Sequence, residues 1–143
     1  MISSSLHFKQ FKLNPIVTLN KPGNLVDVDL SKICENNNLQ FTTSKSFYIN
    51  NLNSIESRGN HSNNNATEIL FCLSGSFDIY LHDGSNETTL HLKENDAIFI
   101  NKNVWIQFNN FKNCVIWAFV DIDENKEKKS CYDFDTFLQM HKK

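Results

Sequence analysis

The chain has 143 residues, a length typical of one domain with a single hydrophobic core. Its 14 basic and 16 acidic residues are interleaved and give a net charge of −2, which argues against a surface for duplex DNA or RNA. With only four Gly and two Pro, collagen-like and Pro-rich linker architectures are excluded. We therefore expect one domain over residues 1–143.

Short apolar runs separated by turn residues follow one another along the chain, a pattern typical of a β-sandwich or barrel. The clearest run is Ser76–His82, in which Phe77, Ile79 and Leu81 alternate with polar residues, and Asp83-Gly84 then marks a hairpin turn. In chain order the predicted strands are Leu6–Phe11, Ile16–Leu19, Asn24–Asp29, Lys45–Asn50, Glu68–Leu73, Ser76–His82, Thr88–Leu92, Ala97–Ile100, Val104–Asn109 and Cys114–Ile122.

Two segments predict short helices. Leu30–Asn36 follows Asp29, a residue type that caps helix N-termini, and Tyr132–Met140 carries apolar residues at helical spacing. Between them, the highly charged segment Asp121–Ser130 predicts a solvated loop. The Asn run at positions 63–65 predicts a turn, because Asn tolerates left-handed backbone.

The four cysteines form no C-x-x-C pair and no zinc-site spacing; they are Cys34, Cys72, Cys114 and Cys131. Residues 1–11 contain no apolar leader core, and no stretch approaches the ~20 apolar residues of a membrane span. We expect a cytoplasmic protein with reduced thiols and no membrane partner.

The segment Arg58-Gly59-Asn60-His61-Ser62-Asn63 contains the strongest candidates for a functional site. Arg58 is the only Arg among the 14 basic residues, and a guanidinium offers phosphate or carboxylate a bidentate fork that Lys does not. Gly59 would allow a tight turn ahead of the predicted strand Glu68–Leu73. Such a turn would present Arg58, His61 and Asn63 at a barrel mouth, where ligand sites gather.

The Arg-Gly-x-His segment at Arg58 lies ten residues after Tyr48 and is followed by Cys72-Leu73-Ser74-Gly75-Ser76. In these features the chain resembles the nucleotide-sugar 3,4-ketoisomerases, the WxcM-like or FdtA-like cupins that act on dTDP-4-oxo-6-deoxyhexoses. The match continues in order at Gly23-Asn24-Leu25-Val26, Phe47-Tyr48-Ile49, Asp83-Gly84, Val104-Trp105 and Tyr132-Asp133.

The resemblance implies a cupin-type antiparallel jelly-roll barrel with a short C-terminal helix. It also implies an isomerase of bacterial deoxysugar and surface-polysaccharide (lipopolysaccharide) biosynthesis, with a dTDP-sugar as its small-molecule partner. A homodimer is expected as well, partly because Leu6–Leu19 is predicted strand outside the minimal barrel and available to pair across an interface.

Moving a ketone from C4 to C3 requires removal of the C3 proton, an enediol, and return of a proton at C4. The base should titrate near neutrality, as imidazole does, and hydrogen-bond donors should stabilise the enolate oxygen. The family's pocket holds a His-x-His pair and a Tyr, which implies His61, Asn63 at the second His, and Tyr48 as the catalytic positions. We expect no cofactor and no metal.

The candidate substrate-binding residues are Arg58, which the resemblance places near the nucleotide diphosphate, Glu68, Trp105 as a stacking partner for the base, and Lys21, next to a position where the family carries Arg.

Two departures from the family pattern affect the chemistry. Asn63 replaces the His usually assigned as the base, and an amide takes no proton at neutral pH. Ile106, after Trp105, replaces another His of the family. Either His61 or Glu68 therefore performs the proton transfer, or the reaction differs, or catalysis has been lost.

Two alternatives remain open on sequence. A metal-binding cupin would use His61 and Glu68, with Gly75 at the expected spacing, but these are two good ligands where a catalytic metal wants about three. A non-catalytic binder of a sugar nucleotide or carbohydrate would need no proton carrier near position 63. The remaining histidines, His7, His82, His91 and His141, are interpreted as non-functional, and Trp117 and Phe119 as core.

Overall fold

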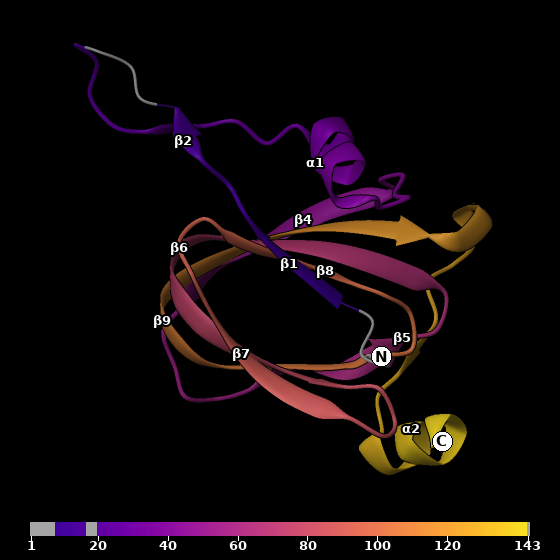
Figure 1. Cartoon of the computed structure of the whole chain (residues 1–143). Coiled ribbons are helices and arrows are strands. Elements are labelled where there is room, and N and C mark those ends of the chain that lie inside the picture. The colour runs from indigo at the N-terminus through magenta and orange to yellow at the C-terminus, as the bar shows by residue number, and fades with distance from the viewer. Residues whose placement is uncertain (1–7, 17–19, 143) are drawn as a thin grey trace.

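The computed structural model describes residues 8–16 and 20–142, which form antiparallel β structure with two short α-helices (Figure 1). In chain order the elements are β1 (Phe8–Lys12), β2 (Pro15–Ile16), β3 (Leu25–Val26), α1 (Leu30–Asn37), β4 (Lys45–Leu52), β5 (Arg58–Asn63), β6 (Ala66–His82), β7 (Glu87–Lys93), β8 (Asp96–Ile100), β9 (Trp105–Ile122), a 3-10 turn (Asp123–Asn125), β10 (Ser130–Cys131) and α2 (Phe134–His141).

Two long strands, β6 and β9, pair with each other from end to end. The first half of β6 also pairs with β8, which continues to β1, whereas its second half pairs with β7. Likewise, the second half of β9 pairs with β4, and its first half pairs with β5, which continues to β10. The long strands therefore join two half-sheets, β1-β8-β6-β9-β4 and β7-β6-β9-β5-β10, as in a jelly roll.

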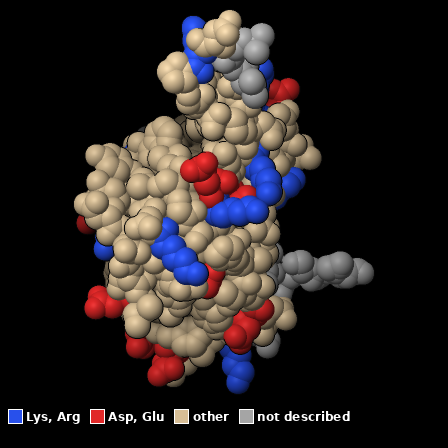
Figure 2. Space-filling model, turned by 90° about the vertical axis from the view of Figure 1, so that its left-hand side faces the viewer, with Lys and Arg blue, Asp and Glu red and all other residues tan. Residues whose placement is uncertain are grey.

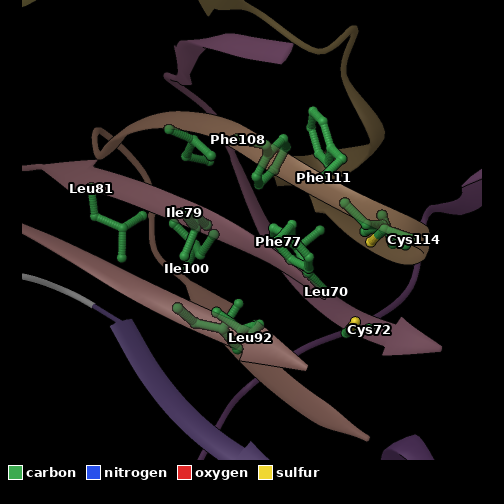
Figure 3. Packing of buried hydrophobic residues seen from close by; sticks show 14 of the residues in the cluster. Leu70, Cys72, Phe77, Ile79, Leu81, Leu92, Ile100, Phe108, Phe111 and Cys114 are labelled. Carbon is green, nitrogen blue, oxygen red and sulfur yellow. The ribbon is translucent and has the colours of Figure 1, made fainter. Parts of the chain in front are cut away.

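The hydrophobic core lies between these half-sheets (Figure 3). Leu70 and Phe77 come from the two halves of β6, Leu92 from β7, and Phe108 and Ile116 from the two halves of β9. Phe77 meets Phe108 edge to face, with ring centroids 5.7 Å apart. Fully burying a side chain of this kind contributes about 1.5–3 kcal/mol, so this cluster supplies most of the driving force for folding.

The outer face of the β6 and β8 half-sheet is covered by a second apolar cluster. Ile69 and Phe71 of β6 alternate with the inward residues and pack with Phe119, under partly buried side chains of α1 and the N-terminal segment. Helix α1 begins at Asp29, whose carboxylate accepts a hydrogen bond from the Lys32 backbone amide (3.1 Å). The predicted core role of Phe119 and its neighbour in this cluster, Trp117, agrees with this packing.

Helix α2 packs at the other end of the molecule from α1 (Figure 1). It begins at Asp133, which accepts a hydrogen bond from the Thr136 amide (3.0 Å). Phe137 is fully buried, and with Phe134 it contacts the ring of Trp105, at centroid distances of 5.7 and 5.1 Å. The helix therefore closes the core over the start of β9.

The predicted all-β fold with a short C-terminal helix is confirmed, and both predicted helices are present. Four predicted strands join in pairs to form β6 and β9, because each backbone continues its pairing through a bend. Two predictions were wrong. Arg58–Asn63 is strand β5 rather than a turn, and the Phe8–Lys12 part of Leu6–Leu19 is not left outside the sheet, since β1 pairs with β8 of its own chain. Pro15–Ile16 pairs with β3 in a separate two-stranded sheet. Within Leu6–Leu19, residues 6, 7 and 17–19 lie outside the described part of the chain.

Charged side chains of both signs are interspersed on the face drawn in Figure 2, in keeping with the net charge of −2. In the part of the chain that the structure describes, no helix has the length and apolar character needed to cross a membrane.

Gly75 lies at the bend of β6 with a φ of +67°, and a Cβ there would lie 2.1 Å from the Lys112 carbonyl oxygen. We predict that Gly75→Ala lowers the free energy of unfolding by more than about 3 kcal/mol, because left-handed strain of ~1–2 kcal/mol adds to a backbone collision. Gly23→Ala is a matched control, since Gly23 also has a positive φ (+80°) but nothing within 4 Å. In urea denaturation, Gly23→Ala should lower the free energy of unfolding only by the ~1–2 kcal/mol of left-handed strain. Equal losses for the two variants would contradict this explanation of the bend.

Candidate functional site

A cavity of about 350 Å³ opens between β4, β5, β6 and β9, beside the segment that leads into and out of β10. Its wall combines an apolar floor with a few charged and aromatic groups, as ligand sites commonly do. The lining residues are Phe47, Ile49, Arg58, Gly59, His61, Glu68, Leu70, Phe108, Ile116, Ala118, Lys128 and Tyr132.

A bulge in β5 brings Arg58 and His61 to the same wall. Gly59 pairs with Gln107 and His61 with Ile106, so Asn60 is an extra residue on β5. Residues three apart in a regular strand face opposite sides, but one inserted residue restores the same side. Gly59 (φ +91°) and Asn60 (φ +52°) supply the left-handed conformations that the bulge needs.

His61 is half-buried, and its Nε2 is enclosed without a hydrogen-bond partner among the described residues. Its ring lies against that of Tyr132, with centroids 5.8 Å apart and planes 35° apart. The imidazole is therefore held at the cavity wall with one nitrogen unused by the protein. An imidazole nitrogen without a partner in the protein is a candidate for proton exchange with a bound ligand.

Glu68 faces the cavity from β6 and is only 4% exposed. Its Oε1 accepts a hydrogen bond from Asn63 Nδ2 (2.5 Å), and Asn63 Oδ1 accepts one from Ser130 Oγ (3.1 Å). Asn63 was expected at a catalytic position, but its side chain is bound to Glu68 and Ser130 and is not among those that line the cavity. The nitrogen of the Asn63 amide is bound to Glu68 and its oxygen to Ser130, so the amide links these two side chains.

Tyr48 lies on the opposite face of β4 from the cavity. Phe47 pairs with Ala118 and Ile49 with Ile116, and all four side chains line the cavity. Tyr48 pairs with Trp117 on the outer face and is 67% exposed. The catalytic role that the resemblance implies for Tyr48 would need its hydroxyl in the cavity, but strand alternation gives the inward position to Phe47. The tyrosine that reaches the cavity is Tyr132.

Trp105 and Lys21 also lie away from the cavity. Trp105 is 4% exposed and is enclosed by Phe134 and Phe137 of α2, so no ring face is open for a nucleobase. Lys21 is an exposed residue between β2 and β3 and is not part of the cavity wall. Of the four substrate-binding candidates, the structure brings only Arg58 and Glu68 together with His61.

Lys128 is a lining residue that sequence reasoning missed. It lies in the segment predicted as a solvated loop, yet it is half-buried at the cavity. The side chain of Asn65 holds this segment on both sides of Lys128, since Asn65 Nδ2 donates to the Glu127 carbonyl (3.0 Å) and Asn65 Oδ1 accepts from the Lys129 amide (2.8 Å). Contacts over more than 60 residues leave no periodic signal, so local sequence patterns could not reveal them.

His82, His91 and His141 do not line the cavity, and His7 lies outside the described residues. Over residues 8–16 and 20–142, no group of three or more His, Cys, Asp or Glu side chains is arranged to hold a metal ion.

Residues 10–142 match the model of the family described as "FdtA: WxcM-like, C-terminal". The chain belongs to this family. It is 26% identical over 117 residues, 80% of each chain, to the TDP-4-oxo-6-deoxy-alpha-D-glucose-3,4-oxoisomerase of Aneurinibacillus thermoaerophilus.

Solved structures of similar fold include two 3,4-ketoisomerases. The WlaRB TDP-quinovose 3,4-ketoisomerase of Campylobacter jejuni is 25% identical, with a TM-score of 0.76 over 93% of this chain and 98% of that one. A 3,4-ketoisomerase of Helicobacter canadensis is 24% identical, with a TM-score of 0.79 over 94% and 97% of the two chains. These likenesses agree with the jelly-roll arrangement described above.

We predict that Asn65→Ala loosens the segment around Lys128, because it removes two hydrogen bonds that hold the segment's backbone. Trypsin should cleave the native protein after Lys126, Lys128 or Lys129 several times faster than in the wild type. Asn64→Ala is the matched control, since Asn64 contacts the segment through its backbone amide, which donates to the Lys129 carbonyl (2.9 Å). Equal cleavage of the two variants would show that the Asn65 side chain does not hold the segment.

Proposed function

We propose that this protein is a dTDP-4-oxo-6-deoxyhexose 3,4-ketoisomerase. The observation that carries the proposal is the cavity, in which His61 has an unpartnered nitrogen and lies on the same wall as Arg58, in a chain of the WxcM-like family. The curated relative and the similar solved structures are named as 3,4-ketoisomerases of TDP-sugars or as 3,4-ketoisomerases.

The wall fits the demands of such a substrate. A volume of about 350 Å³ lies within the ~300–1,000 Å³ range of small-molecule sites and would receive the hexose. Arg58 is exposed at the rim and Lys128 is half-buried, so the two cations would bind the diphosphate. His61 would take the C3 proton and return it at C4, while Tyr132 would donate a hydrogen bond to a sugar oxygen.

One observation favours the alternative of a non-catalytic binder. The position where the family carries a second His is occupied by Asn63, whose side chain is bound to Glu68 and Ser130. A binder with the same cavity would retain affinity for a sugar nucleotide without moving a proton.

We also propose that the protein works as a cytoplasmic homodimer. All four cysteines are free thiols, which fits a reducing compartment. Tyr48 is 67% exposed on the outer face of β4, a strand at the edge of its half-sheet that pairs with β9. Exposed aromatic residues on an edge strand are typical of a surface that a second copy covers.

We predict that the wild type, given dTDP-4-oxo-6-deoxyglucose in D2O, forms the 3-oxo isomer and incorporates deuterium at the exchanging carbons, as seen by NMR. His61→Asn should lower turnover by about 10²–10⁴, the usual effect of removing a general base. His91→Asn is the control, because His91 lies on β7 in an exposed pair with Asp78 and outside the cavity. Binding of dTDP-sugar without isomerisation or exchange in the wild type would support the binder instead.

Arg58→Lys should weaken the binding of TDP about tenfold or more, measured by titration calorimetry. A bidentate, charge-assisted contact contributes about 1.5–3 kcal/mol, and Lys cannot reproduce its geometry. The melting temperature should stay nearly unchanged because Arg58 is exposed. If Arg58→Lys instead unfolds the protein, Arg58 is a structural residue and the assignment of the diphosphate site fails.

A further inference from the structure

A second proton-carrying side chain faces the same cavity as His61. Glu68 is 4% exposed, and in the described part of the chain no Lys, Arg or His nitrogen lies within 4.0 Å of its carboxylate. A buried carboxylate without a cation contributes little to stability, and a neutral or apolar residue of the same size would serve the fold better. A buried carboxyl group of this kind is therefore expected where it takes part in binding or catalysis.

The carboxyl group of Glu68 is oriented by a chain of side chains rather than by a charge. Ser130 Oγ donates to Asn63 Oδ1, which turns the amide nitrogen of Asn63 toward Glu68 Oε1. The amide of Asn63 cannot act as an acid or base near neutral pH, but it holds one oxygen of the Glu68 carboxyl group in place. The other oxygen, Oε2, has no hydrogen-bond partner among the described residues, and Glu68 lines the cavity.

The isomerisation moves protons on oxygen as well as on carbon. As the C3 proton leaves, the carbonyl oxygen at C4 must gain a proton, and as the C3 carbonyl forms, the hydroxyl at C3 must lose one. One imidazole that carries the carbon-bound proton cannot also serve both oxygens at the same moment. A second group at the same wall is therefore required, unless water takes its place.

We propose that Glu68 carries the oxygen-bound proton and that Asn63 is its positioning residue; this rests on the proposed isomerase function. In the first half, His61 takes the C3 proton, the C3–H electrons form the C3=C4 bond, and the carbonyl electrons move to O4 as an enolate. The Glu68 carboxylate then takes the O3 proton and delivers it to O4. In the second half, the O3 electrons form the C3=O bond, and the C3=C4 electrons take the proton from His61 at C4. Both side chains end in their starting states, so no co-reactant is needed.

Glu68→Gln is the direct test, because the amide keeps the shape and an oxygen acceptor for Asn63 but cannot transfer the proton. Turnover should fall by about 10²–10⁴ while the affinity for TDP stays within twofold of the wild type and the melting temperature is retained. Glu56→Gln is the matched control, since Glu56 is exposed and does not line the cavity. Glu68→Asp keeps a carboxyl group that is withdrawn by one carbon and should recover part of the turnover.

Asn63→Ala tests the positioning role. It should lower kcat about tenfold with little change in KM, and adding it to Glu68→Gln should cause no further loss, because the two residues act as one unit. Turnover of Glu68→Gln within threefold of an active wild type would overturn this proposal and leave the isomerase function standing. A wild type that binds dTDP-sugar but neither isomerises it nor exchanges its protons would overturn both.

Discussion

The pairing of β6 with β9 is the interaction on which the remaining structure depends. The two strands run antiparallel from Ala66 opposite Ile122 to His82 opposite Trp105, and both change direction where Gly75 passes close to the Lys112 carbonyl. Each half of this bent ribbon then pairs with its own neighbouring strands, so one strand pair with register shifts at the bend produces two facing half-sheets. The core and the cavity both lie in the space that this bend encloses.

Within that apolar space, a polar site requires local structural features that turn particular side chains toward the cavity. The bulge at Gly59 and Asn60 places Arg58 and His61 on one wall, although they are three residues apart. The Asn run that follows pairs with the segment before α2 and brings Lys128 to the rim. Hydrogen bonds to these buried polar groups offset the free energy lost when they leave water, because a buried polar group without a partner is destabilising.

The exchange of a family His for Asn63 changes how proton transfer can be organised in this chain. An amide in that position donates to the neighbouring carboxyl group of Glu68, so an imidazole and a carboxyl group face the cavity together, beside Arg58, Lys128 and Tyr132. Such a pair can serve carbon and oxygen atoms separately, which the isomerisation of a ketose requires. Asn63 in place of a histidine is thus compatible with an isomerase that transfers protons through different residues and with a non-catalytic binder.

Features that depend on a few neighbouring residues were determined by the sequence alone. The caps at Asp29 and Asp133 and the alternation in Ser76–His82 were predicted correctly, because their physics is local. The sequence also pointed to Arg58, His61 and Glu68 as site candidates, and these three residues do share the cavity.

Only the tertiary structure decided which way Tyr48 faces, what covers Trp105 and which cation joins Arg58. Tyr48 faces outward because of its register against Trp117, and Trp105 is enclosed because α2 returns to it from the end of the chain. Lys128 reaches the cavity because Asn65 binds the backbone on either side of it. These outcomes depend on contacts between segments far apart in the sequence, and the spacing of residues along a chain carries no record of such contacts.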